Sequence, residues 1–199
     1  MILYLGIIGV AVLCIAAAAA VFSSETFLVT LGWTVFATIA VMLVDGVTAA
    51  ICRLLPQAFV DPAKRVFHVS AREKQFYEKL KIRKWKDKVP EIGHFTGFRK
   101  NKLDDPKNIE YIDRFLLESC YGELGHITSC VTGYLILLLA PVYRLWLAIA
   151  IPVATVSLLL NIPTVMILRY NSYKLRVLRK NNVKKQGLQA SVLVEKLAE

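Results

Sequence analysis

Apolar and polar positions fall into long separate blocks along this chain. Residues 1–24 contain no charge, and a second apolar tract over about 26–55 is interrupted by one acid, Asp45. Residues 127–143 and 145–168 are again without charge. About 20 apolar residues in a helix cross the ~30 Å hydrocarbon core of a bilayer. The pattern therefore predicts four transmembrane helices over about residues 2–22, 27–52, 126–143 and 145–168.

The segments between these tracts are polar and basic. Within the segment 53–125, which joins the second and third spans, residues 61–107 are soluble in character, and we expect residues 62–88 to form one basic amphipathic helix. Pro90, Gly93 and Gly97 then indicate a loop, and Asp105-Pro106 marks the start of a further helix. Residues 169–199 are predicted to form a basic tail helix. The expected fold is an all-α integral membrane protein in which residues 1–199 form a single membrane domain.

Composition and charge support membrane residence. Hydrophobic residues make up 56% of the 199 residues, and the net charge of +10 is confined to the polar segments. Charges are kept out of the apolar tracts because one at the bilayer centre costs about 2.5–3.5 kcal/mol. A soluble basic protein that binds nucleic acid would have to expose these tracts to water. Nucleic acid is therefore not an expected partner.

The distribution of Lys and Arg predicts the orientation. Fifteen of them lie in residues 53–107 and eight in residues 169–196, whereas the opposite side carries only Arg144. The positive-inside rule then places the central segment and both termini in the cytoplasm of a multi-pass cell-membrane protein. The first tract has small residues at Ala16–Ala20 that could suit a signal-peptidase site, but no basic residue precedes it. A retained helix is the preferred interpretation.

Neither the cysteines nor the single intramembrane acid defines a site by itself. There is no Cys-x-x-Cys pair, and no His lies at zinc-finger spacing from any of the four cysteines, Cys14, Cys52, Cys120 and Cys130. No metal or disulfide is expected. Asp45 is a functional candidate because acids are costly inside membranes. An interfacial carboxylate that pairs with Arg53, or that caps a break at Gly46, explains it equally well.

The first candidate constellation lies in residues 118–126, just before the third span. Glu123 and His126 are three residues apart and share a helix face, with Ser119 one turn earlier. A histidine oriented by a carboxylate is a competent general base for an alcohol. The alternative is a satisfied polar face at the headgroup level.

The second constellation is the run of residues 79–88, where six cations surround one Trp. Such a patch is typical of a helix at the surface of an anionic membrane. It also suits the phosphates of an acyl carrier such as coenzyme A. The third constellation, at the inner end of the fourth tract, combines Asn161 and Pro163 with Arg169. An Asn within a membrane helix needs a partner, and a polar break at Pro163 could line a cavity. A simple kink with a snorkelling Arg is the alternative.

In order and spacing these pieces resemble the glycosyl-4,4'-diaponeurosporenoate acyltransferase family, small membrane enzymes of bacterial carotenoid glycolipid synthesis. The likeness covers roughly residues 79–185. Its features are Arg83-Lys84-Trp85-Lys86, Gly93-His94, Glu118, Glu123-Leu124, His126, Asn161 with Pro163, and Arg169-Tyr170-Asn171 with Leu175. The resemblance implies transfer of a fatty acyl group to a sugar hydroxyl of a glycolipid or another lipid-linked acceptor.

Within that reaction we assign roles by inference. His126 is the expected base, assisted by Glu123 or Glu118. The expected substrate-binding residues are Arg83, Lys84, Trp85, Lys86, His94, Asn161, Arg169, Tyr170 and Asn171, with Arg169 and Asn171 placed for a phosphate or an oxyanion. Acyl-coenzyme A or an acyl carrier protein is the expected donor, membrane lipids surround the site, and no other cofactor is needed.

Other classes fit the sequence less well. There is no Gly-x-Ser-x-Gly elbow, and the position five residues after His126 is Val131 rather than the Asp of glycerolipid acyltransferases. A prenylcysteine-methyltransferase-like enzyme lacks support near the C-terminus. A non-enzymatic membrane protein whose basic face binds anionic lipid or a protein partner stays open.

Overall fold

The computed structural model describes residues 2–89 and 103–198, and every regular element within them is helical. Four helical stretches are long and apolar enough to cross a membrane: Tyr4–Ser23, Phe27–Leu54, Ile109–Leu139 and Arg144–Gly187. The predicted all-α fold with four membrane-spanning helices is confirmed.

The first two helices, α1 (Ile2–Ser23) and α2 (Phe27–Leu54), form a hairpin. Thr26 caps α2 by accepting a hydrogen bond from the Val29 backbone N–H at 3.4 Å. The Thr30 hydroxyl donates to the carbonyl of Ala16 at 2.9 Å and ties the two helices together. Helix α2 ends because Pro56 disfavours the α conformation at Leu55, which is extended.

The second hairpin joins α5 (Ile109–Thr132), through the 3-10 turn η4 (Gly133–Leu139), to α6 (Arg144–Ala198). Trp146, only 1% exposed, closes the hairpin by donating from Nε1 to the carbonyl of Ile136 at 3.1 Å. Close contact between helices requires small residues. A Cβ on Gly133 would lie 3.3 Å from Val41 of α2.

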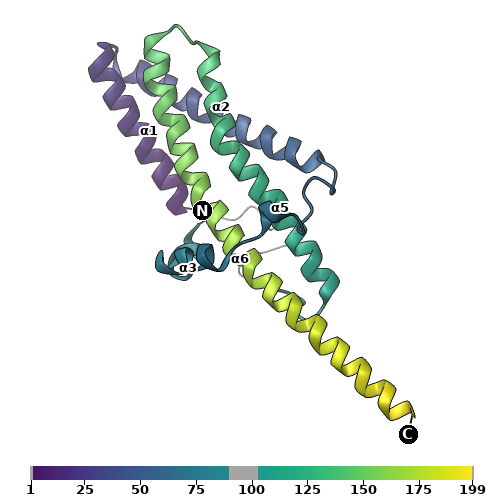
Figure 1. The fold of residues 1–199 in the computed structure, drawn as a ribbon. Coiled ribbons are helices and arrows are strands. Elements are labelled where there is room, and N and C mark those ends of the chain that lie inside the picture. The colour runs from purple at the N-terminus through teal and green to yellow at the C-terminus, as the bar shows by residue number, and fades with distance from the viewer. Residues whose placement is uncertain (1, 90–102, 199) are drawn as a thin grey trace.

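Helix α6 has 55 residues, which correspond to about 80 Å at about 1.5 Å per residue. It packs against other elements as far as Asn182, and its C-terminal end projects beyond the bundle (Figure 1). The basic tail is thus a continuation of the fourth span rather than a separate helix. Pro152 and Pro163 lie inside α6 without ending it. Beside Pro163, the Tyr4 hydroxyl of α1 donates to the carbonyl of Leu160 at 2.9 Å.

The prediction of a single helix over residues 62–88 is wrong. That segment contains four short pieces, η1 (Arg65–Phe67), α3 (Ala71–Lys79), α4 (Ile82–Trp85) and η2 (Lys86–Lys88). Ser70 starts α3 by accepting from the Glu73 backbone N–H at 3.1 Å. Lys81 separates α3 from α4 because its backbone is left-handed, with φ 53°, a conformation that a helix cannot continue.

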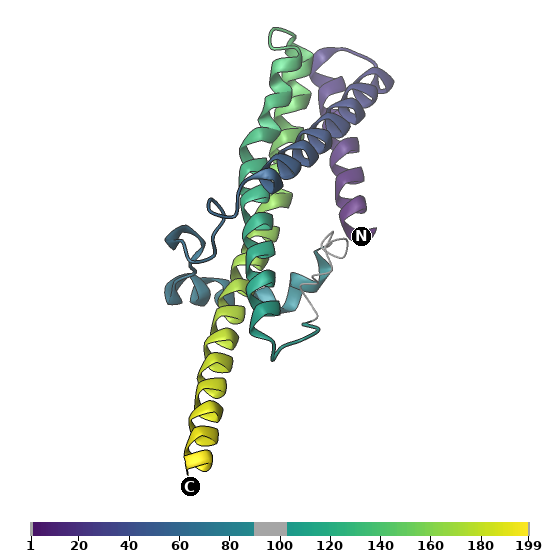
Figure 2. The same ribbon diagram turned by 90° about the vertical axis from the view of Figure 1, so that its right-hand side faces the viewer.

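Both hairpin tips lie at one end of the bundle, whereas the start of α1 and the α3 segment lie toward the other end (Figure 1). Helix α2 crosses the other spans obliquely (Figure 2). The outward faces of α1 and α2 carry exposed apolar side chains, among them Phe22, Leu28, Phe36 and Leu43. Such a surface suits lipid rather than water.

Candidate active site

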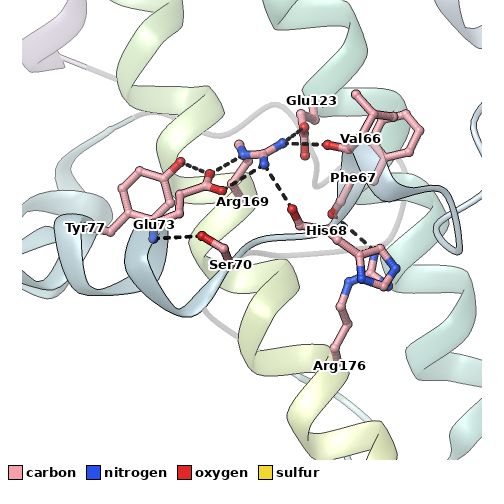
Figure 3. Close-up of polar contacts among 9 residues, drawn as sticks. All are labelled: Val66, Phe67, His68, Ser70, Glu73, Tyr77, Glu123, Arg169 and Arg176. Carbon is pink, nitrogen blue, oxygen red and sulfur yellow. Dashed lines mark hydrogen bonds and ion pairs between the residues drawn. The ribbon is translucent and has the colours of Figure 1, made fainter.

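Arg169 of α6 is the centre of a polar cluster at the junction of three helices (Figure 3). Its Nε and Nη2 bind the two carboxylate oxygens of Glu73 of α3 at 2.5 and 3.0 Å. Its Nη1 binds Glu123 of α5 and donates to the carbonyl of Val66 at 3.2 Å, and its Nη2 donates to the carbonyl of His68 at 3.4 Å. All five N–H groups of the guanidinium are therefore occupied.

The loop before α3 reaches this cluster because a second arginine holds it. Arg176, two helical turns after Arg169, donates from Nη2 to the carbonyls of Pro62 and Phe67 at 2.7 and 3.3 Å. Its Nη1 lies 3.4 Å from Nε2 of His68. An arginine only donates, so the Nε2 lone pair of His68 is the acceptor and is occupied.

Charge and burial fix the ionisation of the α3 residues. Partial burial raises the pKa of Glu73, but hydrogen bonds from Arg169 and Tyr77 together outweigh burial and hold that pKa below its usual value. Burial, and then the hydrogen bond to Glu73, raise the pKa of the Tyr77 phenol above its usual range. Tyr77 therefore stays protonated and donates to Glu73 at 2.5 Å.

His126 of α5 is the first residue of the third predicted span, and it bonds to α6. Its Nδ1 is 2.7 Å from Oδ1 of Asn161. The amide nitrogen of Asn161 donates to the Ser157 carbonyl at 3.0 Å and to the Ser157 hydroxyl at 3.3 Å. Since that nitrogen is engaged, Oδ1 is the acceptor and Nδ1 of His126 carries the hydrogen. The neutral ring then keeps a free lone pair on Nε2, which is what a general base requires.

The expected pairing of His126 with Glu123 or Glu118 is not formed. Glu123 turns to Arg169, and Glu118 binds Arg53 of α2 with an N–O distance of 2.8 Å. Each carboxylate meets a cation that a neighbouring helix brings within reach, which a single-helix argument does not see. The suggested pairing of Asp45 with Arg53 is excluded by the same contact, and α2 continues through Gly46 without a break.

The cations of the basic run differ in their contacts. Arg83 donates from Nε to the Tyr170 hydroxyl at 2.7 Å, and its Nη2 lies 3.6 Å from the Glu78 carboxylate, although the side chain is largely exposed. Lys84 is exposed, and Lys86 lies 4.0 Å from the Asp87 carboxylate. Trp85 donates from Nε1 to the carbonyl of Leu80 at 3.0 Å.

The other expected substrate-binding residues, Tyr170, Asn171 and His94, also differ in their surroundings. Tyr170 is buried and lies under Lys174, whose Nζ is 4.4 Å from the ring centroid. Asn171 is half-buried, and its side chain makes no hydrogen bond to another residue that the structure describes. His94 lies outside the described residues.

An apolar cavity of about 340 Å³ lies between α1, α4 and α6. Its walls are almost wholly hydrocarbon, and the residues that line it are Tyr4, Ile7, Trp85, Lys88, Val89, Leu160 and Pro163. The cavity thus opens beside the predicted basic run, next to the turn of α6 that holds Asn161. Among residues 2–89 and 103–198, no three His, Cys, Asp or Glu side chains cluster as metal ligands.

The sequence model of one protein family, described as glycosyl-4,4'-diaponeurosporenoate acyltransferase, matches residues 62–181. This is more than half of the chain. The chain belongs to this acyltransferase family. The match begins at Pro62, which Arg176 binds, and ends on α6 beyond Arg169, so it contains the whole Arg169 cluster. No curated protein and no solved structure shows significant similarity to the chain.

Sequence reasoning missed several polar residues of these two networks. Glu73 follows Ser70 by three residues, a capping-box spacing that explains the residue without any further role. Tyr77 lies one turn after Glu73, and Ser157 one turn before Asn161. The Ser157–Asn161 spacing within an apolar tract was a usable signal, because two polar residues one turn apart share a face.

Proposed function

We propose that this acyltransferase moves a fatty acyl group from a thioester donor to a hydroxyl of a lipid-linked acceptor at the cytoplasmic face of the membrane. The name of the family gives a glycosyl carotenoid as the acceptor, and a sugar hydroxyl is the acceptor group that we favour. The orientation rests on the basic segments that flank the second and fourth spans. Because α1 and α2 pack against α5 and α6, we treat the chain as one membrane domain.

The observation that carries the proposed mechanism is the 2.7 Å contact between His126 and Asn161. It presents Nε2 as the only basic nitrogen of the ring. In the proposed step the acceptor oxygen attacks the thioester carbonyl carbon while its proton moves to Nε2. The C–S bond breaks as the carbonyl re-forms, and the thiolate takes the proton back from the imidazolium. The products are the ester and a free thiol, and no acyl-enzyme forms.

In this proposal the acyl donor extends along α6 from the basic run to His126. Asn161 and Tyr170 are nine residues apart on α6, or about 13 Å along the axis. Arg83, bound to Tyr170, and exposed Lys84 supply cations for the phosphates of coenzyme A or an acyl carrier protein. The flexible pantetheine arm would bridge the axial distance, and the apolar cavity beside Trp85 suits the acyl chain. Lys86, His94 and Asn171 are retained as substrate-binding candidates.

Arg169 has a different role in this proposal from the expected one. Its five donors are satisfied by Glu73, Glu123 and two carbonyls, so an oxyanion or phosphate would have to displace them. We assign Arg169 and Glu123 to holding α3 and the loop before it against α5 and α6. Glu118, paired with Arg53, joins α2 to α5 in the same way.

The proposal is tested by thiol release from an acyl-coenzyme A, with purified protein in detergent and a glycosyl carotenoid or another glycolipid as acceptor. His126→Gln should lower turnover by about 10²- to 10⁴-fold, the range for general base catalysis. His68→Ala is the matched control, because the ring nitrogen of His68 is already bound to Arg176. Full turnover of His126→Gln would remove His126 as the base. Lipid mass spectrometry of cells with and without the gene would identify the acceptor, as a species that loses one acyl group.

A further inference from the structure

A directed chain of hydrogen bonds runs from α5 through α6 to α2. His126 bonds to Asn161 at 2.7 Å, and Asn161 donates to the Ser157 hydroxyl at 3.3 Å. The Ser157 hydroxyl in turn donates to Oδ2 of Asp45 at 2.7 Å. Three membrane helices therefore meet in one polar network that ends on a carboxylate.

The Ser157 backbone carbonyl and the Asp45 carboxylate together set the directions of the bonds in this network. The carbonyl only accepts, so it holds the amide nitrogen of Asn161 at 3.0 Å and leaves Oδ1 of Asn161 facing Nδ1–H of His126, whatever residue stands at position 45. In its ionised form Asp45 also only accepts, so the Ser157 hydroxyl donates to it and accepts from the amide of Asn161. Asp45 therefore adds a negative charge at the end of a network whose orientation the Ser157 carbonyl holds.

Asp45 is otherwise difficult to account for. A carboxylate within a membrane helix is costly and is kept where it has a task. Its other oxygen, Oδ1, is buried and accepts no hydrogen bond within the part of the chain that the structure describes. Gly133 leaves it room, since a Cβ there would lie 3.8 Å from Oδ1. The neighbouring cation on α2, Arg53, is bound elsewhere.

We infer that Asp45, as a carboxylate, is a positioning residue of the acyl transfer, which acts through Ser157 and Asn161 to stabilise the imidazolium that forms on His126. A base that is oriented by a further group, with an acid at the end of the chain, is the arrangement that activates nucleophiles in many enzymes. Asp45 lies outside the matched residues 62–181, so α2 completes a site whose other members lie within them. The inference rests on the proposed role of His126 as base.

The test compares Asp45→Asn and Ser157→Ala with wild type. Both should lower kcat about 10- to 100-fold, less than the loss of about 10²- to 10⁴-fold expected for the base itself, with KM for donor and acceptor unchanged. The double variant should lose no more than either single one, because the two residues act in one network. Thr38→Val is the matched control on α2, since among the described residues the Thr38 hydroxyl bonds only to the carbonyl of Thr34 in its own helix.

A second readout separates positioning from folding. In ¹⁵N-histidine NMR of the detergent-solubilised protein, the signals that disappear in His126→Gln belong to His126. Wild type and both variants should show them as the Nδ1–H tautomer, because the Ser157 carbonyl still holds Asn161 in each. A fall in kcat with this tautomer intact assigns the loss to the charge of Asp45. Unchanged kcat in Asp45→Asn, or loss of the Nδ1–H tautomer in that variant, overturns this inference while His126 can still be the base. Full activity of His126→Gln overturns the proposed function itself.

Discussion

Arg169 of α6 forms an ion pair with Glu123 of α5. Glu123 is only 1% exposed, and its second carboxylate oxygen, Oε2, accepts no hydrogen bond within the described residues. The same guanidinium holds Glu73 of α3. One cation therefore pairs with two carboxylates from two other elements, and it fastens α3 and the loop before it to the membrane bundle.

Removing this cation should strongly destabilise the folded protein. Arg169→Ala would leave the Glu123 carboxylate buried without a counter-charge, which costs about 3–5 kcal/mol. The measurement is the free energy of unfolding in detergent by chemical denaturation. Arg179→Ala is the control, because the Arg179–Asp113 pair joins the same two helices but is 43% exposed on both sides, and an exposed pair contributes about 0–1 kcal/mol. Equal losses in the two variants would contradict the assigned role of Arg169.

The Glu73 contacts predict a loss of stability in acid. Because the folded protein holds the pKa of Glu73 below its usual value near 4.5, the contribution is present above that pH. It is lost as the pH falls through the lower folded-state pKa. Thermal unfolding in detergent should show a fall in this window that Glu73→Gln makes shallower. Glu78→Gln, on the same helix and paired with Lys74 at the surface, should leave the slope unchanged. A slope that Glu73→Gln does not alter would rule out this contribution.

Close packing at Gly133 should be intolerant of side chains. A Cβ at this position already meets Val41 at 3.3 Å, and the larger Val would also press on Asp45 and Ser157. Gly133→Val should destabilise the protein by about 1–3 kcal/mol, the usual cost of overpacking. Gly32→Val is the comparison, since nothing lies within 4 Å of its Cβ. Thermal unfolding of both variants provides the measurement, and similar midpoints would argue against tight contact between α2 and η4.

Binding of the donor should depend on the cation next to Tyr170. Arg83→Ala removes a guanidinium that is fixed through Nε yet 67% exposed. Loss of one charge-assisted phosphate contact should raise KM for the thioester about 3- to 10-fold with kcat unchanged, because such a contact is equal in ground and transition states. Arg72→Ala, an exposed cation on α3, should leave KM as it is. A fall in kcat without a change in KM would place Arg83 elsewhere in the mechanism.

Some expectations followed directly from local chemistry. The four spans could be predicted because the transfer of an apolar segment into lipid depends on that segment alone. Local composition could not show that residues 62–88 form several short pieces rather than the single helix that we expected. Nothing in the composition around Lys81 demands a left-handed backbone, and the break reflects how α4 packs with Tyr170 and Ile167 of α6.

The candidate site shows the same division. His126, Asn161, Glu123 and Arg169 could be named from the sequence, because polar residues at the edge of an apolar tract are few and costly. Their partners could not be named. His126 shares a helix face with Glu123, yet each bonds to a residue of α6 instead.

The sequence by itself determined that this chain crosses a membrane four times, and its order of motifs indicated the acyltransferase family that the match over residues 62–181 confirms. Only the tertiary structure decided which charges meet. From Asp113 to Glu123 along α5, the partners step back from Arg179 to Arg169 along α6, as antiparallel helices require. Pairings across helices depend on this register and on the oblique path of α2. A local pattern contains no information about either, because both arise from the packing of the whole bundle.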